Sequence, residues 1–294
     1  MLSLKNTAKF VYHNTNIFDE IVYRNKVNKI SIEDRNLIAK NTVYKDCHKG
    51  ERCFILGNGP SIRELDFYKL KDEYVFTVNQ LSRLDNFYEL NTNYHMWSDE
   101  RFFDLDATRH EDMELLEVMK KVKGKSNPVV FYKVFAKKMI DSYLLHDILN
   151  ISYFDDVYIP NTTDKLKFVD YSKPVPVFPT VIHYLICLSV YMGFKEIYLL
   201  GCDCTGFVSI ANNYMNGNNF NYSYDVSENE KKRMKRVNSK ITISEELAWY
   251  ADIFAIYEKL NKYCRNNGVN LYNSTKGGLL DCISRKDIKT VLKK

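Results

Sequence analysis

The sequence predicts an α/β protein with a doubly wound, mostly parallel sheet, helices on both faces of that sheet and a helical N-terminal extension. Short apolar runs that suit buried strands recur along the chain, helical stretches fall between several of them, and glycine or polar residues follow their ends. We expect strands at residues 52–56, 74–78, 94–98, 129–133, 156–159, 195–200 and 269–272.

Length and composition limit the classes of protein. The chain has 294 residues, 45% of them hydrophobic, which allows one large α/β domain with an appendage or two small domains. No run of about 18 apolar residues predicts a membrane-spanning helix, and Met1–Lys5 lacks the apolar core of a secretion signal. Seven cysteines, several of them within apolar stretches, fit a reducing cytoplasm better than a disulfide framework. The net charge of +5 is compatible with an anionic substrate.

The most specific motif follows the first predicted strand. It consists of Gly57, Asn58, Gly59, Pro60 and Ser61. The glycines let the backbone turn sharply and approach a ligand closely, and Pro60 suits the first turn of a helix, which Ser61 and Glu64 can help to fix. A strand, a glycine turn and a helix N-terminus together bind phosphate groups. We therefore predict a nucleotide-binding loop, with an ordinary tight turn as the alternative.

Small or polar residues also follow three other predicted strands. They are Asn79 and Gln80, then Ser98 and Asp99, and finally Gly201, Cys202 and Asp203. Ligands of doubly wound sheets bind beyond the carboxyl ends of the strands, so these residues are expected to share one pocket. Asn79 can both donate to and accept from a base or a sugar.

Residues 180–193 predict a buried helix. Thr180 is a good N-cap, the following residues are apolar almost all round, and Gly193 suits a left-handed cap. Thr180 is placed to face the ligand pocket. For His183, one turn in, we expect a packing role rather than catalysis.

The chain carries a long polar insertion, residues 206–240, which suggests a lid for the acceptor. Its basic run, Lys231–Arg236, is expected to be a solvated surface, although it would suit phosphates. A helix should follow from about residue 243 to 267, capped by Thr242 and Glu245. Its expected buried face comprises Leu247, Tyr250, Phe254, Tyr257, Leu260 and Cys264.

Both ends of the chain carry weaker signals. After the last predicted strand, Ser274 and Thr275 precede Lys276 and two glycines, which suggests either a phosphate contact or a simple turn. Near the N-terminus an apolar stripe comprises Phe10, Val11, Ile17, Phe18, Ile21 and Val22. It predicts a packed helix, with peripheral contact to a membrane surface as the alternative. We place the extension at residues 1–48 and the nucleotide-binding domain at 49–294.

Several segments together resemble the MptE-like domain. They are Cys53–Ser61, Val78–Gln80, Trp97–Asp99, Met192–Asp203 and Asn273–Asp281. That domain occurs in archaeal 6-hydroxymethyl-dihydropterin diphosphokinase, in Maf-type flagellin glycosylation proteins and in proteins of bacterial surface polysaccharide synthesis. The first, second and fourth segments also resemble glycosyltransferase family 42, the bacterial sialyltransferases that use CMP-sialic acid. The resemblance covers roughly residues 48 to 285.

The resemblance implies a Rossmann-like fold that holds a nucleotide with the first loop. By matching position, Asn58 and Asn79 would contact the nucleotide, and Thr180 would lie near its phosphate. The sialyltransferases use a histidine, with tyrosines, beyond the strand that matches residues 195–200. This chain has no histidine after residue 205, so the resemblance assigns no general base.

The leading hypothesis is a cytoplasmic transferase of bacterial surface glycan synthesis. It would take a group from a nucleotide-activated donor, with a CMP sugar favoured, and transfer it to a hydroxyl of a glycan or small-molecule acceptor. Such a reaction needs a base, for which Asp203 is the first candidate and Asp99 the second. The predicted nucleotide-binding residues are Gly57, Asn58, Gly59, Pro60, Ser61, Asn79, Gln80, Thr180, Ser274 and Thr275.

Two alternatives stay open. One is a Mg²⁺-dependent diphosphokinase that transfers from ATP to a 6-hydroxymethylpterin-type alcohol, with Asp99 and Asp203 holding the ion. The other is a non-catalytic nucleotide-sugar-binding subunit, which the missing histidine favours. No cofactor other than Mg²⁺ is suggested, and no nucleic-acid partner is predicted.

Overall fold

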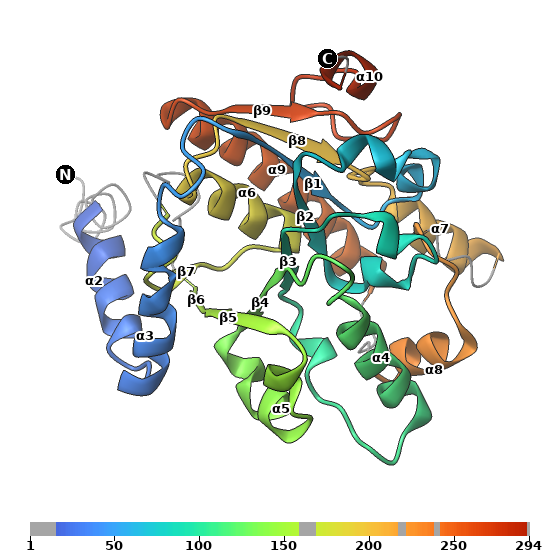
Figure 1. Ribbon diagram of the computed structural model, residues 1–294, viewed down its shortest axis with the longest axis horizontal. Helices are drawn as coiled ribbons and strands as arrows, with labels where there is room; N and C mark the ends of the chain where they lie inside the picture. Colours follow the sequence, from blue (N-terminus) through green and yellow to red (C-terminus); the bar gives the residue numbers. More distant parts are fainter. Residues whose placement is uncertain (1–15, 159–168, 217–221, 238–241, 293–294) are drawn as a thin grey trace, which may run out of the picture.

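The computed structural model of the chain describes residues 16–158, 169–216, 222–237 and 242–292. At its centre lies a seven-stranded sheet in which every pairing is parallel (Figure 1). In spatial order the strands are β5 (Asn150–Phe154), β4 (Val129–Lys133), β3 (Tyr94–Trp97), β2 (Tyr74–Val78), β1 (Arg52–Leu56), β8 (Glu196–Leu200) and β9 (Asn270–Asn273). The predicted α/β fold class is confirmed.

The central strands are apolar on both faces because both faces are covered. Alternate side chains of a strand point to opposite faces, and in β1 Ile55 joins one hydrophobic cluster while Phe54 joins another. Cys53 lies opposite Tyr74 of β2 and Ile197 of β8, so β1 is paired along both of its edges. An uninterrupted apolar run is what a strand in this position requires.

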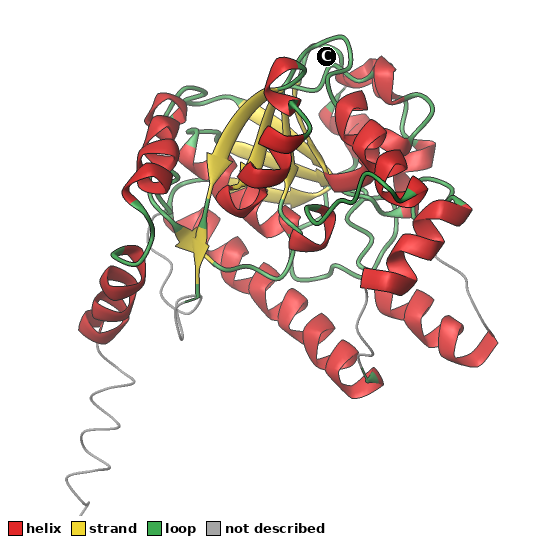
Figure 2. Cartoon of the chain, turned by 90° about the horizontal axis from the view of Figure 1, so that it is seen from below, coloured by secondary structure: helices red, strands yellow, loops and turns green. Residues whose placement is uncertain are grey.

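Helices lie on both faces of the sheet (Figure 2). On one face α6 (Val181–Tyr191) and α9 (Ile243–Asn266) pack with Met96 and Phe131. On the other face α4 (His110–Lys121) and α5 (Lys137–Ser142) pack with Trp97 and Tyr132. Consecutive residues of β3 and β4 thus belong to two separate hydrophobic cores, one on each face of the sheet.

The other helices are short and lie at the periphery. They are α2 (Asn16–Val27), α3 (Ile32–Ala39), α7 (Gly206–Asn216), α8 (Glu228–Val237) and α10 (Ile288–Val291). Single 3₁₀ turns span Lys40–Tyr44, Pro60–Glu64, Phe67–Leu70, Asn79–Arg83, Phe87–Glu89, Glu100–Phe102, Val134–Ala136 and Leu145–Asp147.

The edge of the sheet beyond β4 differs from the prediction. Residues 156–159 were expected to form a strand of the main sheet, but β5 fills that place and is absent from the expected set. Among the described residues 156–158, Asp156–Val157 forms β6, which pairs with β7 (Val175–Pro176) in a separate sheet. The polar residues of β5 obscured its signal. Ser152 is buried because it donates to Asn41, whose segment covers this edge.

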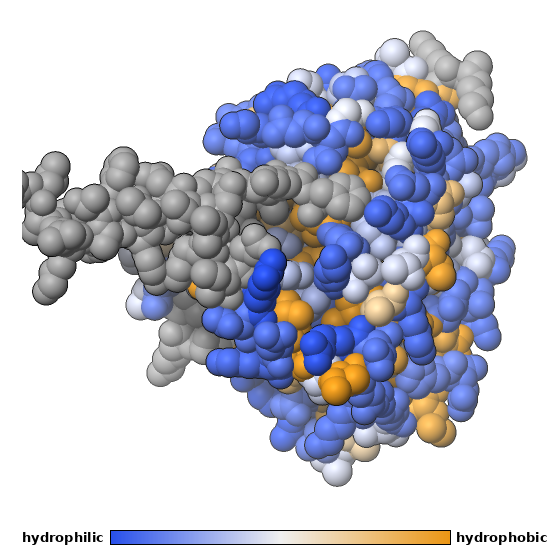
Figure 3. Space-filling model, turned by 90° about the vertical axis from the view of Figure 1, so that its left-hand side faces the viewer, coloured by the Kyte–Doolittle hydropathy of each residue, from blue (hydrophilic) through white to orange (hydrophobic). Residues whose placement is uncertain are grey.

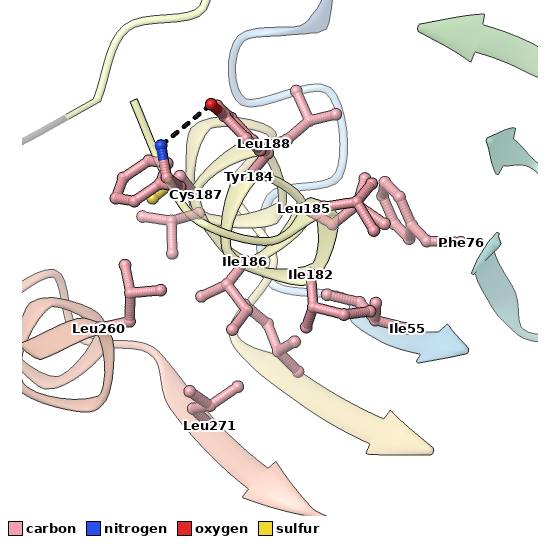
Figure 4. Packing of buried hydrophobic residues seen from close by; sticks show 14 of the residues in the cluster. Ile55, Phe76, Ile182, Tyr184, Leu185, Ile186, Cys187, Leu188, Leu260 and Leu271 are labelled. Carbon is pink, nitrogen blue, oxygen red and sulfur yellow. Dashed lines mark hydrogen bonds between the residues drawn. The ribbon is translucent and has the colours of Figure 1, made fainter. Parts of the chain in front are cut away.

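Helix α6 follows the prediction closely. All its residues are buried, and Figure 4 shows Ile182 and Leu185 packed against Ile55 of β1 and Phe76 of β2. Gly193 adopts a φ of +90°, and the amide of Phe194 reaches back to Ser189, which ends the helix. The helix therefore lies across β1, β2 and β3 as a fixed support.

The N-terminal helices cover the β5 edge. Asn41 donates to the carbonyl oxygens of Tyr153 and Tyr171, and Tyr23 donates to that of Pro174. A hollow of about 330 Å³ lies between α2, α3 and Pro174, away from the centre of the sheet. The face of the molecule on this side is mainly hydrophilic, with small apolar patches between charged residues (Figure 3).

Most of the predicted apolar stripe near the N-terminus lies outside the described residues. Phe10 and Val11 precede the described residues, and the side chains of Ile17, Phe18 and Ile21 are not described either. Within the described ranges, no helix is long and apolar enough to cross a membrane. The domain boundary at residue 48 stays a prediction.

Helix α9 begins with the predicted capping box of Thr242 and Glu245. Tyr257, Leu260 and Cys264 are buried as expected. Leu247 was expected to be buried and is 52% exposed, and its neighbours Ala248 and Trp249 in the first part of α9 are exposed too.

Candidate functional site

The order of the strands reverses at the centre of the sheet. From β1 the chain passes through β2, β3, β4 and β5 on one side and then returns to β8 and β9 on the other. Doubly wound sheets bind ligands at this switch point, beside the carboxyl ends of the strands. Here it lies between β1 and β8, so the predicted residues Gly57–Ser61 and Gly201–Asp203 flank it.

The two glycines of the first loop let the ends of β1 and β8 approach each other. The amide of Gly57 donates to Leu200 O at 2.8 Å, and the amide of Gly59 donates to Gly201 O at 2.8 Å. A Cβ on either glycine would lie 2.5 Å from Gly201 O. The glycines thus serve a contact between two backbone segments, whereas the sequence suggested contact with a ligand.

The predicted α-helix after Gly59 is absent. Pro60–Glu64 forms a single 3₁₀ turn, and Ser61 does not cap it. Instead the Ser61 amide and hydroxyl donate to Asp203 Oδ1 and Oδ2 at 3.2 and 2.8 Å. A carboxylate of the chain itself therefore binds the amide that was expected to bind phosphate, and it fastens the first loop to the end of β8.

Asp203 is buried at this junction, with 6% of its surface exposed. Burial raises the pKa of its carboxyl group because the charged form is poorly solvated, and the two bonds from Ser61 oppose that shift. A carboxylate with a raised pKa is a stronger base than an ordinary aspartate, which is the property that the predicted role requires.

Asn58 and Asn79 follow adjacent strands and share an unusual feature. The side-chain oxygen Oδ1 of each is buried and has no hydrogen-bond partner. Asn79 has a φ of +41°, a left-handed conformation that is uncommon for residues other than glycine but that asparagine adopts more readily than most. Asn58 is held in place by the amide of Ser223, which donates to its carbonyl oxygen at 2.9 Å. Buried unpartnered oxygens are costly unless a ligand pairs with them.

The side chain of Gln80 is occupied by the polar insertion. It donates to Glu230 Oε1 of α8 at 2.7 Å and accepts from Arg83 Nε at 2.5 Å. Glu230 also binds Arg233 and Arg83, and all four side chains are largely buried. A network of hydrogen bonds and ion pairs therefore anchors α8, within the predicted lid, to the residue that follows Asn79. Figure 1 shows α8 beside α4.

The basic run of the insertion pairs with acidic residues. Arg233 is 3% exposed, which differs from the expected solvated surface. Lys232 binds Glu111 at 3.2 Å, and Arg236 binds Asp112, both on α4. These pairs dock α8 on α4.

Ser274 and Thr275 lie at the carboxyl end of β9 and bond to the protein. Ser274 Oγ donates to Lys286 O at 2.6 Å. Thr275 Oγ1 accepts from the amide of Cys202 at 3.0 Å, beside Asp203. These bonds connect the ends of β8 and β9, and a contact of either hydroxyl with phosphate stays a prediction.

Asp99 is separated from Asp203 along the sheet edge. It follows β3, three strand spacings from β8, which is about 14 Å. Both of its oxygens bind the guanidinium of Arg101, at 3.0 and 2.6 Å. Since Mg²⁺ ligands lie about 2.1 Å from the ion, this placement gives no support to an ion shared with Asp203. Within the described ranges no group of three His, Cys, Asp or Glu side chains is arranged to hold a metal.

The N-terminus of α6 lies at the same edge, because the helix leads into the amino end of β8. Thr180 precedes the helix, makes no capping bond, and has a buried hydroxyl without a hydrogen-bond partner. Both ring nitrogens of His183 are buried and equally lack partners. The ring of Tyr257 meets that of His183 edge-on, with centroids 4.3 Å apart.

Tyr257 connects this group with the end of β8. Burial raises the pKa of its hydroxyl, Cys202 and Cys204 add to the shift, and the hydroxyl of Thr180 opposes it. All three neighbours therefore lie close to Tyr257, although no hydrogen bond of ordinary geometry reaches Thr180 Oγ1. Since Cys202 also adjoins Gly57, Thr180 belongs to the same neighbourhood as the first loop.

Further residues of this edge were not predicted as site residues. Burial raises the pKa of Tyr222, and the nearby charge of Arg101 opposes that shift. Lys133 ends β4 and is 8% exposed, with Nζ 2.8 Å from Asp156 Oδ2. Lys133 could have been found by the rule that selected Asp99, since it too stands at a strand end. Tyr222 lies near Arg101 and Asp99, which are far from it in the sequence, and such a contact leaves no local signal.

Comparisons with known proteins address the fold. No protein-family model matches the chain, and no curated protein matches it. The fold is similar to that of a MAf glycosyltransferase from Magnetospirillum magneticum AMB-1, with a TM-score of 0.43 and 13% identity over 97% of this chain. The chain spans 42% of the length of that structure.

The fold is also similar to the sialyltransferase CstII from Campylobacter jejuni, in complex with a substrate analogue, cytidine-5'-monophosphate. The TM-score is 0.38 and the identity 16%, over 78% of this chain and 82% of the other. The expected likeness to Maf-type proteins and bacterial sialyltransferases is confirmed as a structural similarity. It concerns the fold and assigns no residue a role.

Proposed function

We propose that this chain is a transferase of bacterial surface glycan synthesis that uses a nucleotide-activated donor, with a CMP sugar favoured. The acceptor would be a hydroxyl of a glycan or a small molecule. The proposal includes a cytoplasmic location. Peripheral contact of the first fifty residues with a membrane surface stays an alternative within it.

One observation carries the proposal. Asn58, Asn79 and Thr180 each bury a polar atom that has no hydrogen-bond partner among the described residues. Asn58 and Asn79 follow strands β1 and β2, and Thr180 precedes α6, at the edge of the sheet where ligands of this fold class bind. Amide and hydroxyl groups of this kind suit the sugar, base and phosphate of a nucleotide. The resemblance in sequence selects the same three residues.

The chemistry requires a base for the acceptor hydroxyl and stabilisation of the leaving phosphate. Asp203 is the candidate base, because it is buried beside the switch point and its pKa is raised. It would take the proton of the acceptor oxygen as that oxygen bonds to the transferred carbon. The leaving phosphate would be stabilised by backbone amides that have no acceptor among the described residues and by hydroxyl groups, both at the carboxyl edge of the sheet.

Binding is tested with a panel of CMP, CDP, UDP, GDP and ATP, each with and without Mg²⁺, in a thermal-shift assay. CMP, the ligand in the CstII complex, should raise the melting temperature most and without Mg²⁺, because a ligand of the native state stabilises it. A response confined to ATP with Mg²⁺ would favour the diphosphokinase instead. No response to any nucleotide would contradict the proposal.

Single substitutions separate binding from chemistry. Asn58→Ala should abolish CMP binding, because it removes a buried group that the nucleotide pairs with. Asp203→Asn should retain binding and lose turnover by about 100-fold or more. In the unaltered protein, turnover should fall on acidification with an apparent pKa above the ordinary aspartate range, since the base is then protonated. Full turnover of Asp203→Asn, measured with a CMP sugar, would exclude this base.

A non-catalytic nucleotide-binding subunit is the second candidate. The observation in its favour is that the oxygens of Asp203 bind Ser61 and those of Asp99 bind Arg101. Both carboxylates thus have structural tasks already. Asp203→Asn should lower stability in either case, because an amide cannot accept both bonds from Ser61. A non-catalytic subunit is distinguished by nucleotide binding without turnover in the unaltered protein as well as in the variant.

A further inference from the structure

His183 has no partner in a place where its polarity is costly. It is 0% exposed and lies within α6, whose residues are otherwise nearly all apolar. A neutral imidazole carries one hydrogen-bond donor and one acceptor, and here neither nitrogen has a partner. An apolar side chain would fill this position without the penalty of two unpaired polar atoms.

The position of His183 on the helix directs it toward the sheet edge. Side chains three residues apart share one face of a helix, and each leans toward the N-terminal end. His183 therefore leans toward the N-terminal end of α6, where Thr180 stands. The hydroxyl of Thr180 is also buried, and its polar neighbour Tyr257 makes no hydrogen bond of ordinary geometry with it. The ring of Tyr257 meets the imidazole edge-on, and the hydroxyl of Tyr257 lies near that of Thr180.

The first turn of α6 adds two backbone donors. The amide of His183 bonds to Thr180 O, whereas those of Val181 and Ile182 have no acceptor among the described residues. Since α6 is an eleven-residue helix, its N-terminus also carries a partial positive charge. Free amides, a hydroxyl and an imidazole together present mainly donors, which suits the oxygens of an anion.

We infer that His183, together with Thr180 and the first-turn amides of α6, binds the phosphate oxygens of the nucleotide donor. This rests on the proposed function and adds to it a residue that neither sequence nor resemblance assigned to the site. Burial lowers the pKa of the imidazole to about 3, so His183 stays neutral and donates through one nitrogen. It acts as a specificity residue for the phosphate.

The test compares CMP with cytidine, which lacks only the phosphate, by titration calorimetry. In the unaltered protein CMP should bind more tightly than cytidine. His183→Leu should reduce that preference by about 10-fold to 100-fold, the effect of one hydrogen bond to a charged group, and leave cytidine affinity nearly unchanged. His183→Gln, which keeps a donor and an acceptor, should restore part of the preference.

A matched control distinguishes binding from packing. Tyr132 also buries an unpaired hydroxyl, but it lies in the core on the opposite face of the sheet. His183→Leu and Tyr132→Phe should both leave thermal stability unchanged or raised, since each removes unpaired buried polarity. Only the first should alter the preference for CMP.

The outcomes separate the two proposals. If the unaltered protein binds neither CMP nor cytidine, the proposed function fails. If it prefers CMP and His183→Leu keeps the full preference, the inference about His183 alone is wrong. An equal loss of CMP and cytidine affinity in His183→Leu would also overturn it, because the residue would then support the whole site and not the phosphate.

Discussion

Replacement of Glu230 by glutamine should lower the free energy of unfolding by about 3–5 kcal/mol. Glu230 is 1% exposed and binds the guanidinium groups of Arg233 and Arg83, which are themselves buried. Glutamine has the same size but no charge, so the two arginines would lose the charge that compensates for their burial. Urea denaturation should show a lower midpoint with a similar slope.

The same helix offers a matched control. Glu228 is exposed and pairs with Lys231 at its surface, where solvent screens the interaction. Glu228→Gln should therefore leave the midpoint unchanged. If Glu230→Gln unfolds like the unaltered protein, the ion pairs do not hold α8 in place.

The Glu230 substitution should also weaken nucleotide binding. Glu230 fixes the side chain of Gln80, and Gln80 follows the strained Asn79 directly. Loss of the anchor would let that turn relax and would increase the cost of ordering Asn79 for a ligand. The insertion should thus influence nucleotide binding, although its helix α8 packs on α4.

The central strands could be predicted from sequence because their signal is local. A strand covered on both faces needs an unbroken apolar run, as in β1, and a polar residue then marks its end. The edge strand β5 lacked this signal, because Ser152 is satisfied by Asn41, a residue 111 positions away. When the polar residues of a strand bond to partners so far away in the sequence, the strand's own sequence pattern looks like that of a loop.

The candidate site was predictable in position but not in its internal bonds. Topology placed Gly57–Ser61 and Asp203 at the same switch point, and both lie there. That Ser61 binds Asp203, 142 residues along the chain, has no local signature. Gln80 was selected by the same positional rule, yet its partner Glu230 comes from an insertion whose docking could not be read from composition.

Replacement of Gly59 by alanine should be among the most damaging changes to the site. Gly59 has a φ of −70°, which any residue adopts, so the effect arises from space alone. The new Cβ would lie 2.5 Å from Gly201 O and closer still to Asp203 Oδ2. To relieve the overlap, the loop must leave β8 or Asp203 must leave Ser61, and we expect a loss of about 3 kcal/mol in stability.

Gly277→Ala is the matched control, because it isolates backbone strain. Gly277 has a φ of +69° and open space around it, so alanine there should cost only about 1–2 kcal/mol. Gly59→Ala should in addition abolish CMP binding, since Asn58 precedes it in the displaced loop, whereas Gly277→Ala should bind normally. If Gly59→Ala bound CMP with unchanged affinity, the close contact between the ends of β1 and β8 would not be required for the site. Denaturation gives the stability of the two variants and calorimetry gives their affinity for CMP. Together they show whether the first loop needs glycine at position 59 because the loop packs against the end of β8.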